Sequence, residues 1–241
     1  MTTVRRTGAA ACLLLALLTL LTVVVAVRHG APLPGDRALH RWPLDHRPPV
    51  AVATARAITA TGTGVVPYVL VVVAGLIAGR GGKGRRYAVA GALTVLALGQ
   101  AVRYALMATV SRPRPAAVDW ATTASGFSFP SGHTATSALT AGLLAWAVLT
   151  RSTSSAARPT IAVLSLWAVA VGLSRVYLGV HWASDVLGGW LFASLWLCLA
   201  ALATARGARI VGGRPVDPSP GPPGAPLPNG PRDGAPRDQL P

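Results

Sequence analysis

The sequence predicts an all-α membrane protein, a polytopic bundle of six transmembrane helices. Hydrophobic residues make up 52% of its 241 residues and charged residues only 12%, a balance typical of chains that face lipid rather than water. Lipid offers the backbone no hydrogen-bond partners, so a spanning segment must be a helix or part of a closed barrel. The apolar runs lack the alternation of barrel strands, which leaves helices. These runs are residues 9–27, 65–78, 87–110, 134–149, 161–173 and 186–203.

The first run decides whether the N-terminus stays in the membrane. Residues 9–27 follow Arg5 and Arg6, as the apolar part of a signal peptide would. The run is longer than the roughly 7–15 apolar residues of a signal peptide and approaches the roughly 20 that span a bilayer. We therefore expect an uncleaved first span.

Composition divides the chain into a membrane domain and two terminal segments. We expect a short cytoplasmic N-terminus at residues 1–8, the six-span domain at 9–205 and a cytoplasmic tail at 206–241. The tail is rich in Pro and Gly and has almost no large apolar side chain with which to form a core. It is therefore expected to be disordered.

Basic residues indicate the side of the membrane on which each loop lies. With six spans, four segments on one side carry all of the following and no acidic residue: Arg5, Arg6, Arg80, Lys83, Arg85, Arg86, Arg151, Arg158, Arg206, Arg209 and Arg214. Such loops face the cytoplasm, so we expect a cell-membrane protein with both termini cytoplasmic. The loops at 28–60, 111–130 and 179–184 then lie on the extracytoplasmic face. Residues 36–60 fit either an interfacial amphipathic helix or a solvated loop.

The charge and the cysteines exclude several functions. A net charge of +15 would suggest a nucleic-acid partner in a soluble protein. Here the basic residues lie between apolar runs, and no basic patch interleaves with aromatic residues, so we expect no nucleic acid. Cys12 and Cys198 lie inside apolar runs, where cysteine is a small hydrophobic residue. Without a cysteine or acidic cluster, we expect no metal and no cofactor.

Residues 174–185 place an arginine, a histidine and an aspartate at the edge of an apolar run. Charge beside a membrane segment is costly, which marks these residues as functional candidates. His181 and Asp185 are four residues apart, so they share a face on a helix. Asp185 can then fix the tautomer of His181 and leave the other ring nitrogen as a nucleophile, while Arg175 offers a fork suited to phosphate oxygens. The alternative for the pair alone is a buried ion pair with an interfacial histidine.

The segment Pro130-Ser131-Gly132-His133 stands just before the fourth apolar run. Ser131 suits the N-cap of a helix, and Gly132 lets an anion approach the backbone closely. The free N–H groups of that helix start would face a phosphate, and His133 is placed to protonate a leaving alkoxide. The alternative is a well-capped helix with a solvent-facing histidine.

The segment Ser111-Arg112-Pro113-Arg114-Pro115 supplies two more arginines. Its prolines end the preceding helix and hold the chain extended, so Arg112 and Arg114 need not face the same way. We expect one to face a phosphate pocket and the other to meet lipid headgroups or solvent. Two histidines, one carboxylate and several arginines together indicate phosphoryl transfer without a metal.

Together the three motifs resemble the type 2 phosphatidic acid phosphatase superfamily, which includes six-span bacterial lipid phosphatases, vanadium haloperoxidases and glucose-6-phosphatase. The pattern of that family is a lysine, six residues and Arg-Pro; then Pro-Ser-Gly-His; then Ser-Arg, five residues, His, three residues and Asp. The second and third motifs are complete here and in the same order, and the resemblance covers roughly residues 36–205. It implies the helical core of those enzymes and hydrolysis of a lipid phosphomonoester or diphosphate through a phosphohistidine.

The resemblance also implies a role for each matching residue. His181 would be the nucleophile, Asp185 its orienting partner and His133 the general acid. The implied phosphate-binding residues are Arg114, Arg175, Ser131 and Gly132, with Arg112 and Arg103 as further candidates.

One position departs from the family pattern and keeps an alternative open. Met107 stands where the family has its lysine, and Arg103, one helical turn earlier, is the candidate replacement. A non-catalytic or transport-associated protein that binds lipid phosphates is favoured by Met107 alone. A haloperoxidase, with His181 ligating vanadium, is disfavoured because those enzymes are soluble. The expected partners are the bilayer and a lipid phosphate of the undecaprenyl diphosphate, phosphatidate or phosphatidylglycerol phosphate class, with no obligate protein partner.

Overall fold

The computed structural model describes residues 2–212, and every regular element in that part of the chain is a helix. Each of the six predicted apolar runs lies within one of these helices, which confirms the all-α class. The elements are α1 (Thr2–Val27), α2 (Asp36–Asp45), α3 (Pro49–Ala60), α4 (Val65–Ala78), α5 (Gly81–Val110), the 3₁₀ turn η1 (Ala117–Asp119), α6 (Gly132–Leu149), α7 (Ser154–Tyr177) and α8 (Ala183–Gly212).

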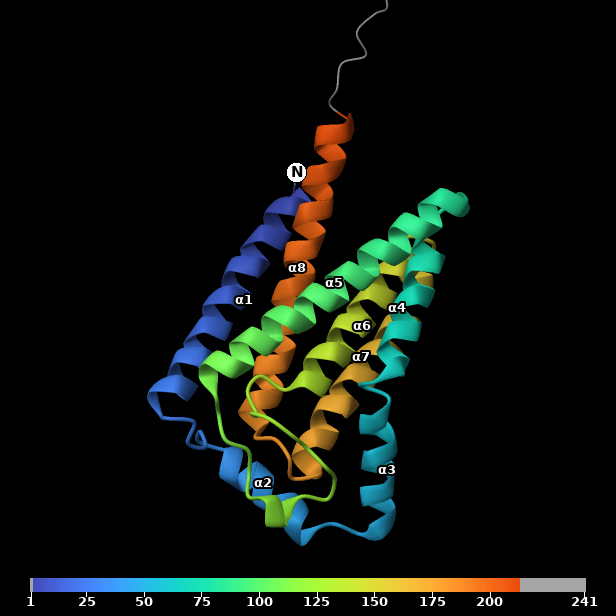
Figure 1. The fold of residues 1–241 in the computed structure, drawn as a ribbon. Helices are drawn as coiled ribbons and strands as arrows, with labels where there is room; N and C mark the ends of the chain where they lie inside the picture. Colours follow the sequence, from blue (N-terminus) through green and yellow to red (C-terminus); the bar gives the residue numbers. More distant parts are fainter. Residues whose placement is uncertain (1, 213–241) are drawn as a thin grey trace, which may run out of the picture. The chain divides into compact units, whose positions relative to one another are not determined.

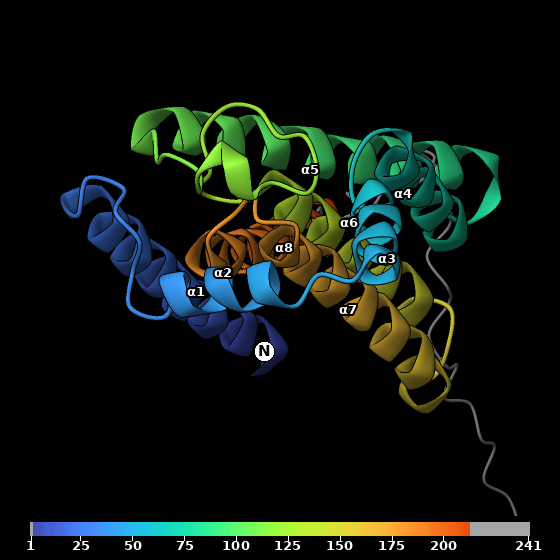
Figure 2. The same cartoon turned by 90° about the horizontal axis from the view of Figure 1, so that it is seen from below.

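Helix α6 lies inside the bundle. It contacts α4, α5 and α7, and Figure 2 shows these helices grouped around it. Its buried positions include four polar side chains, Thr134, Thr136, Ser137 and Thr140. A helix enclosed by protein needs no continuous apolar surface, so α6 can carry hydroxyl groups that a lipid-facing helix would avoid.

The outer helices instead expose large apolar side chains. Examples are Leu13 and Leu20 on α1, Val69 on α4 and Leu166 on α7. Apolar surface on this scale suits lipid rather than water. Among residues 2–212, α1, α5, α7 and α8 are long and apolar enough to cross a membrane, and the bent pair α3 and α4 would make a fifth span. The protein is therefore a multi-pass membrane protein, but the predicted count of six spans is not confirmed.

The segment before α4 is helical, so the solvated-loop alternative for residues 36–60 is wrong. It forms α2 and α3, and proline at the first position of α3 favours a helix start there. Helix α3 continues into α4 with a bend of 49°. Figure 1 shows α2 crossing the end of the bundle at which α1, α5 and α7 end and α6 and α8 begin.

The start of the predicted tail also differs from expectation. Helix α8 continues to Gly212, so residues 206–212 are helical rather than disordered. This stretch holds two arginines and one alanine, which favour a helix, beside two glycines, which do not. The rest of the predicted tail, residues 213–241, lies outside the described residues.

Candidate active site

The three motifs meet at one end of the bundle, where α5 and α7 end and α6 and α8 begin (Figure 1). A cavity of about 470 Å³ lies between them. Its lining contains six of the predicted site residues: Arg103, Arg114, Gly132, His133, Arg175 and His181. The other three, Arg112, Ser131 and Asp185, are buried behind the cavity wall.

The turn between α7 and α8 presents His181 to the cavity. Gly179 adopts a φ of 76°, the left-handed conformation that commonly ends a helix and that glycine adopts without strain. Helix α7 therefore stops at Tyr177 and α8 begins at Ala183. This tight reversal leaves Arg175, in the last turn of α7, and His181 lining the same cavity.

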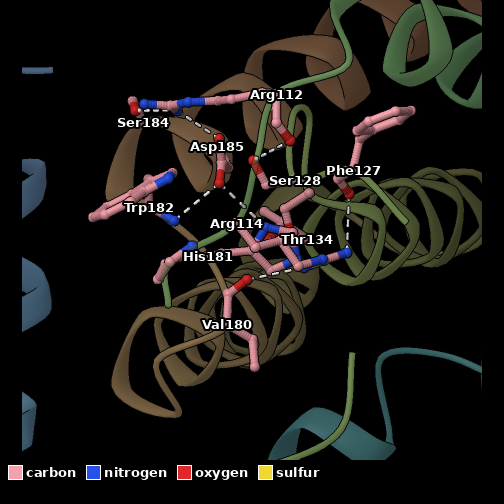
Figure 3. A network of polar contacts seen from close by, with 12 residues as sticks. Arg112, Arg114, Phe127, Ser128, Thr134, Val180, His181, Trp182, Ser184 and Asp185 are labelled. Carbon is pink, nitrogen blue, oxygen red and sulfur yellow. Dashed lines mark hydrogen bonds and ion pairs between the residues drawn. The ribbon is translucent and has the colours of Figure 1, made fainter. Parts of the chain in front are cut away.

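Asp185 orients His181. The two side chains meet through Nδ1 of His181 and Oδ2 of Asp185 at 3.3 Å, and the same oxygen accepts the backbone N–H of Trp182 at 2.9 Å (Figure 3). A carboxylate can only accept, so we assign the ring proton to Nδ1. The lone pair is then on Nε2.

His181 is neutral at physiological pH. Burial lowers the pKa of His181 to about 4; the hydrogen bond and the charge of Asp185 oppose this shift, and the charges of Arg114 and Arg175 add to it. The side chain is only 2% exposed. A neutral imidazole with a free lone pair is the form that attacks an electrophile.

Arg114 covers the lone pair of His181. Its Nη1 lies 2.8 Å from Nε2 of His181. Its remaining hydrogen bonds go to the carbonyl oxygens of Ser125, Gly126, Phe127 and Val180. All five N–H donors of the guanidinium are thus engaged, and an anion can bind Arg114 only by displacing some of these contacts. Burial lowers the pKa of Arg114, Asp185 raises it and Arg103 lowers it further, yet an arginine remains charged.

Arg112 points away from the cavity and is fully buried. It lies behind Asp185 (Figure 3), with Nη1 2.6 Å from Oδ1 of Asp185 and Nη2 2.9 Å from Oδ2 of Asp36. The expectation that one of these two arginines meets lipid headgroups or solvent is therefore wrong. A phosphate-binding role for Arg112 would require it to line the cavity, and it does not. The reason is that two carboxylates lie close enough to pair with it, and paired charges can be buried.

Two guanidinium groups reach the cavity from the helices with N–H groups to spare. Arg175 donates from Nη1 to the hydroxyl of Thr59 at 3.0 Å, and Nη1 of Arg103 lies 3.5 Å from Sδ of Met107. The Nε atoms of both arginines are buried without a partner among the described residues. Buried donors are normally satisfied, so these two groups are suited to a ligand that accepts hydrogen bonds. Their positive charge favours an anion.

The start of α6 forms another side of the cavity. Ser131 takes the N-cap position, but its hydroxyl makes no capping hydrogen bond and instead accepts from Oγ1 of Thr134 at 2.9 Å. It is fully buried, so Ser131 does not contribute its side chain to the cavity wall as predicted. Gly132 and His133 do line the cavity. A Cβ on Gly132 would lie 3.3 Å from the guanidinium carbon of Arg103, so glycine lets this cation approach the helix start.

Sequence reasoning missed Asp36, Thr59 and Gly188. Thr59 holds Arg175, and a Cβ on Gly188 would stand 2.5 Å from Phe129, so this glycine allows the loop before α6 to pack on α8. Asp36 carried a signal, since it is one of four acidic residues before residue 206 in a chain with many arginines. Thr59 and Gly188 are ordinary residues of helices and carried none.

Known proteins share sequence with this chain. Over 67 residues the chain is 42% identical to phosphatidylglycerophosphatase B of Bacillus subtilis (strain 168). Over 89 residues it is 40% identical to phosphatidylglycerophosphatase B of Escherichia coli (strain K12). These matches cover 27% and 36% of this chain. The chain spans about a third of the length of these curated relatives, 33% and 32%.

Solved structures share the fold. The crystal structure of a transmembrane PAP2-type phosphatidylglycerolphosphate phosphatase from Bacillus subtilis matches with a TM-score of 0.69 and 25% identity, over 81% of this chain and 96% of that chain. Aquifex aeolicus LpxE matches with a TM-score of 0.54 and 24% identity, over 68% of this chain and 93% of that chain. The family model described as the PAP2 superfamily covers residues 88–208, half of the chain and all three motifs. This chain belongs to the PAP2 superfamily.

Proposed function

We propose that this protein is a membrane lipid phosphatase that hydrolyses a phosphomonoester or diphosphate of a lipid through a phosphohistidine, without a metal. The observation that carries the proposal is the arrangement around His181: Asp185 on Nδ1, and Nε2 directed to Arg114 in a cavity lined by arginines. A neutral histidine beside fixed cations suits attack on the phosphorus of an anionic group. Membership of the PAP2 superfamily and the names of the relatives support this reaction class.

Substrate binding uses the arginines of the cavity. The phosphoryl oxygens accept hydrogen bonds from the Nε atoms of Arg103 and Arg175, which have no partner within residues 2–212. Such charge-assisted bonds are strong. Arg103 supplies the positive charge that the family places one turn later, where Met107 stands. When an oxygen of the substrate takes over the N–H that Arg114 directs at His181, the lone pair on Nε2 is released.

The first chemical step transfers the phosphoryl group to the enzyme. Nε2 of His181 forms a bond to phosphorus while the bond from phosphorus to the lipid oxygen breaks. His133, whose protonated form is favoured by the negative charge of the bound phosphate, gives its proton to the leaving oxygen. The arginines stabilise the charge on the equatorial oxygens, and Asp185 stabilises the positive charge that develops on the imidazole.

The second step returns the enzyme to its starting state. His133, now neutral, accepts a proton from water as the water oxygen attacks phosphorus. The bond between phosphorus and Nε2 breaks, the electron pair returns to His181, and inorganic phosphate leaves. His133 therefore acts as acid in one step and base in the next.

The cavity suits a lipid whose tail remains in the bilayer. Besides the charged groups, its lining includes Tyr104 and Gln100 of α5 and Thr63 between α3 and α4. Tyr104 and Thr63 are exposed, which supports entry of a headgroup into the cavity beside them. The candidate classes are phosphatidylglycerol phosphate, which the names of the curated relatives favour, undecaprenyl diphosphate and phosphatidate.

The proposed topology has six spans, with α4 and α6 as the two that are short or polar. Helix α6 has only 18 residues, and its hydroxyl groups face protein rather than lipid. With both termini in the cytoplasm, the loops at 28–35, 111–131 and 178–182 lie on the extracytoplasmic side, as does the cavity. Attaching reporters that label only on one side of the membrane to residues of these loops tests the orientation.

Phosphate release from lipid phosphates and diphosphates tests the function. Detergent-purified protein is assayed with EDTA present, beside His181→Ala. We expect metal-independent release from at least one lipid class, lost in His181→Ala, together with acid-labile ³²P on the wild-type chain. Release that persists in His181→Ala would contradict the assignment of the nucleophile.

Met107 favours one alternative, a protein that binds lipid phosphates without hydrolysing them. A folded wild-type protein that binds these lipids and releases no phosphate would support this alternative. Met107→Lys would then be the variant that decides whether the absent family lysine is the reason.

A further inference from the structure

A second carboxylate, Asp36 on α2, is joined to Asp185 through a single guanidinium group. Arg112 lies between them, 2.9 Å from Asp36 and 2.6 Å from Asp185. Asp36 is 2% exposed, and Arg112 and Asp185 are fully buried. The mechanism above uses Asp185 and leaves Asp36 and Arg112 without a function.

Every N–H group of Arg112 has a partner. Nε donates to the carbonyl oxygen of Gly30 at 3.2 Å. Nη1 donates to Oγ of Ser184 at 2.7 Å and to Asp185, and Nη2 donates to the carbonyl oxygen of Ala31 at 3.3 Å and to Asp36. Five satisfied donors fix the guanidinium plane, so the position of Oδ1 of Asp185 is fixed as well.

Asp36 also holds the start of α8, the helix that carries Asp185. Its Oδ1 accepts the backbone N–H of Ser184 at 2.9 Å, and its Oδ2 accepts the hydroxyl of Ser184 at 2.6 Å. Oδ2 further accepts the backbone N–H of Leu33 at 2.8 Å. A carboxylate at the first turn of a helix also meets the positive end of the helix dipole. Asp36 thus links α2, Arg112 and the first turn of α8.

The charges of this cluster do not cancel. One guanidinium neutralises one carboxylate, and here it contacts two, so the cluster Asp36, Arg112 and Asp185 carries one net negative charge. If Arg112 faced Asp185 alone, the pair would be neutral, and it would give little electrostatic stabilisation to an imidazole that becomes positively charged. Electrostatic effects are large in a buried site.

We infer that Asp36 and Arg112 are positioning residues for His181: Asp36 neutralises Arg112, so that the charge of Asp185 remains available to the imidazole during phosphoryl transfer. This inference rests on the proposed function, because it requires His181 to gain positive charge. It makes α2, which lies outside the three motif segments, part of the catalytic apparatus.

Orthovanadate and inorganic phosphate separate this role from a structural one. Vanadate takes the five-coordinate geometry of the transferring phosphoryl group when Nε2 donates its lone pair to vanadium, and the imidazole becomes positive. Phosphate binds the same arginines without that bond. Inhibition constants for both anions are measured with wild-type protein, Asp36→Asn, Arg112→Lys and the control Asp45→Asn. Asp45 is exposed at the other end of α2.

Asp36→Asn is expected to weaken vanadate inhibition and to lower kcat by about 10- to 100-fold, the size of loss typical when outer partners of metal-bound histidines are removed. Phosphate inhibition and KM should change little, and Asp45→Asn should match the wild type. Arg112→Lys keeps the charge but cannot contact both carboxylates with a planar fork. It should show the same selective loss of vanadate affinity, and it decides the question if Asp36→Asn does not fold.

The outcomes are distinct. The inference would be overturned, and the proposed function left intact, if a folded Asp36→Asn shows unchanged vanadate inhibition. If Asp36→Asn does not fold, unchanged vanadate inhibition in Arg112→Lys would have the same meaning. Equal losses for vanadate and phosphate would also overturn it, since they would indicate a distorted cavity. A wild-type protein that neither releases phosphate from lipids nor binds vanadate would instead overturn the proposed function.

Discussion

The buried, neutral state of His181 should make the stability of the protein depend on pH in a defined window. The test is His181→Gln, which keeps an N–H donor for Asp185 at similar size but cannot titrate. Burial lowers the pKa of His181 to about 4 in the folded protein, whereas a histidine in an unfolded chain has a pKa of about 6.5. Between these values the unfolded chain binds a proton that the folded protein does not.

The sign and size of the effect follow from proton linkage. The free energy of unfolding rises with pH wherever the unfolded state binds more protons. The contribution of His181 is therefore complete above pH 6.5, is lost progressively as the pH falls to about 4, and is constant below that. At about 1.4 kcal/mol per pKa unit, the full loss is about 3 kcal/mol. Because the side chain is 2% exposed, solvent screening does not reduce this figure appreciably.

Thermal unfolding in detergent, measured for both proteins from about pH 4 to about pH 8, provides the assay. Groups common to both proteins cancel in the difference between the two curves. We expect the wild type to lose about 3 kcal/mol more than His181→Gln over the acid part of the range. Parallel curves would refute the reasoning, because they would mean that His181 titrates equally in the folded and unfolded states.

Two further predictions concern packing and phosphate binding. Gly75→Ala should destabilise the fold by about 1–3 kcal/mol in thermal unfolding, because its Cβ would collide with the backbone of Val89 and α4 would have to move away from α5. The matched control is Gly91→Ala, whose Cβ would meet open space. This control should be neutral or slightly stabilising. Arg103→Gln should lower kcat/KM by about 10- to 100-fold, the loss of a hydrogen bond to a charged group, and adding Met107→Lys should restore part of it. An unchanged kcat/KM in Arg103→Gln would show that this arginine does not bind the phosphoryl group.

The helices could be predicted from the sequence because hydropathy and run length are local properties. All six apolar runs became helices, and the termination of α5 near Pro113 and of α7 at Gly179 follows from single residues whose backbone preferences are strong. The membrane assignment followed from the same runs. The predicted count of six spans is not confirmed, because α6 is polar for a spanning helix. Its polar content reflects its position inside the bundle, which only packing determines.

The pairing of His181 and Asp185 was accessible to sequence reasoning because four residues on a helix bring two side chains together. Their contact and the lining of the cavity by His133 and Arg175 agree with that reasoning. The arginines of the first motif show its limit. Arg112 and Arg114 have nearly the same sequence surroundings, yet one is buried in an ion cluster and the other lines the cavity.

Local patterns in the sequence were therefore enough to predict the class of fold, the family and the candidate residues for the chemistry. Tertiary structure decided which charges pair. Asp36 meets Ser184 across 148 positions of the chain, and this approach converts Arg112 from a candidate phosphate ligand into the partner of two carboxylates. Burying a charge is favourable only beside an opposite one, and no local pattern reports which distant side chains the fold brings within a few ångströms.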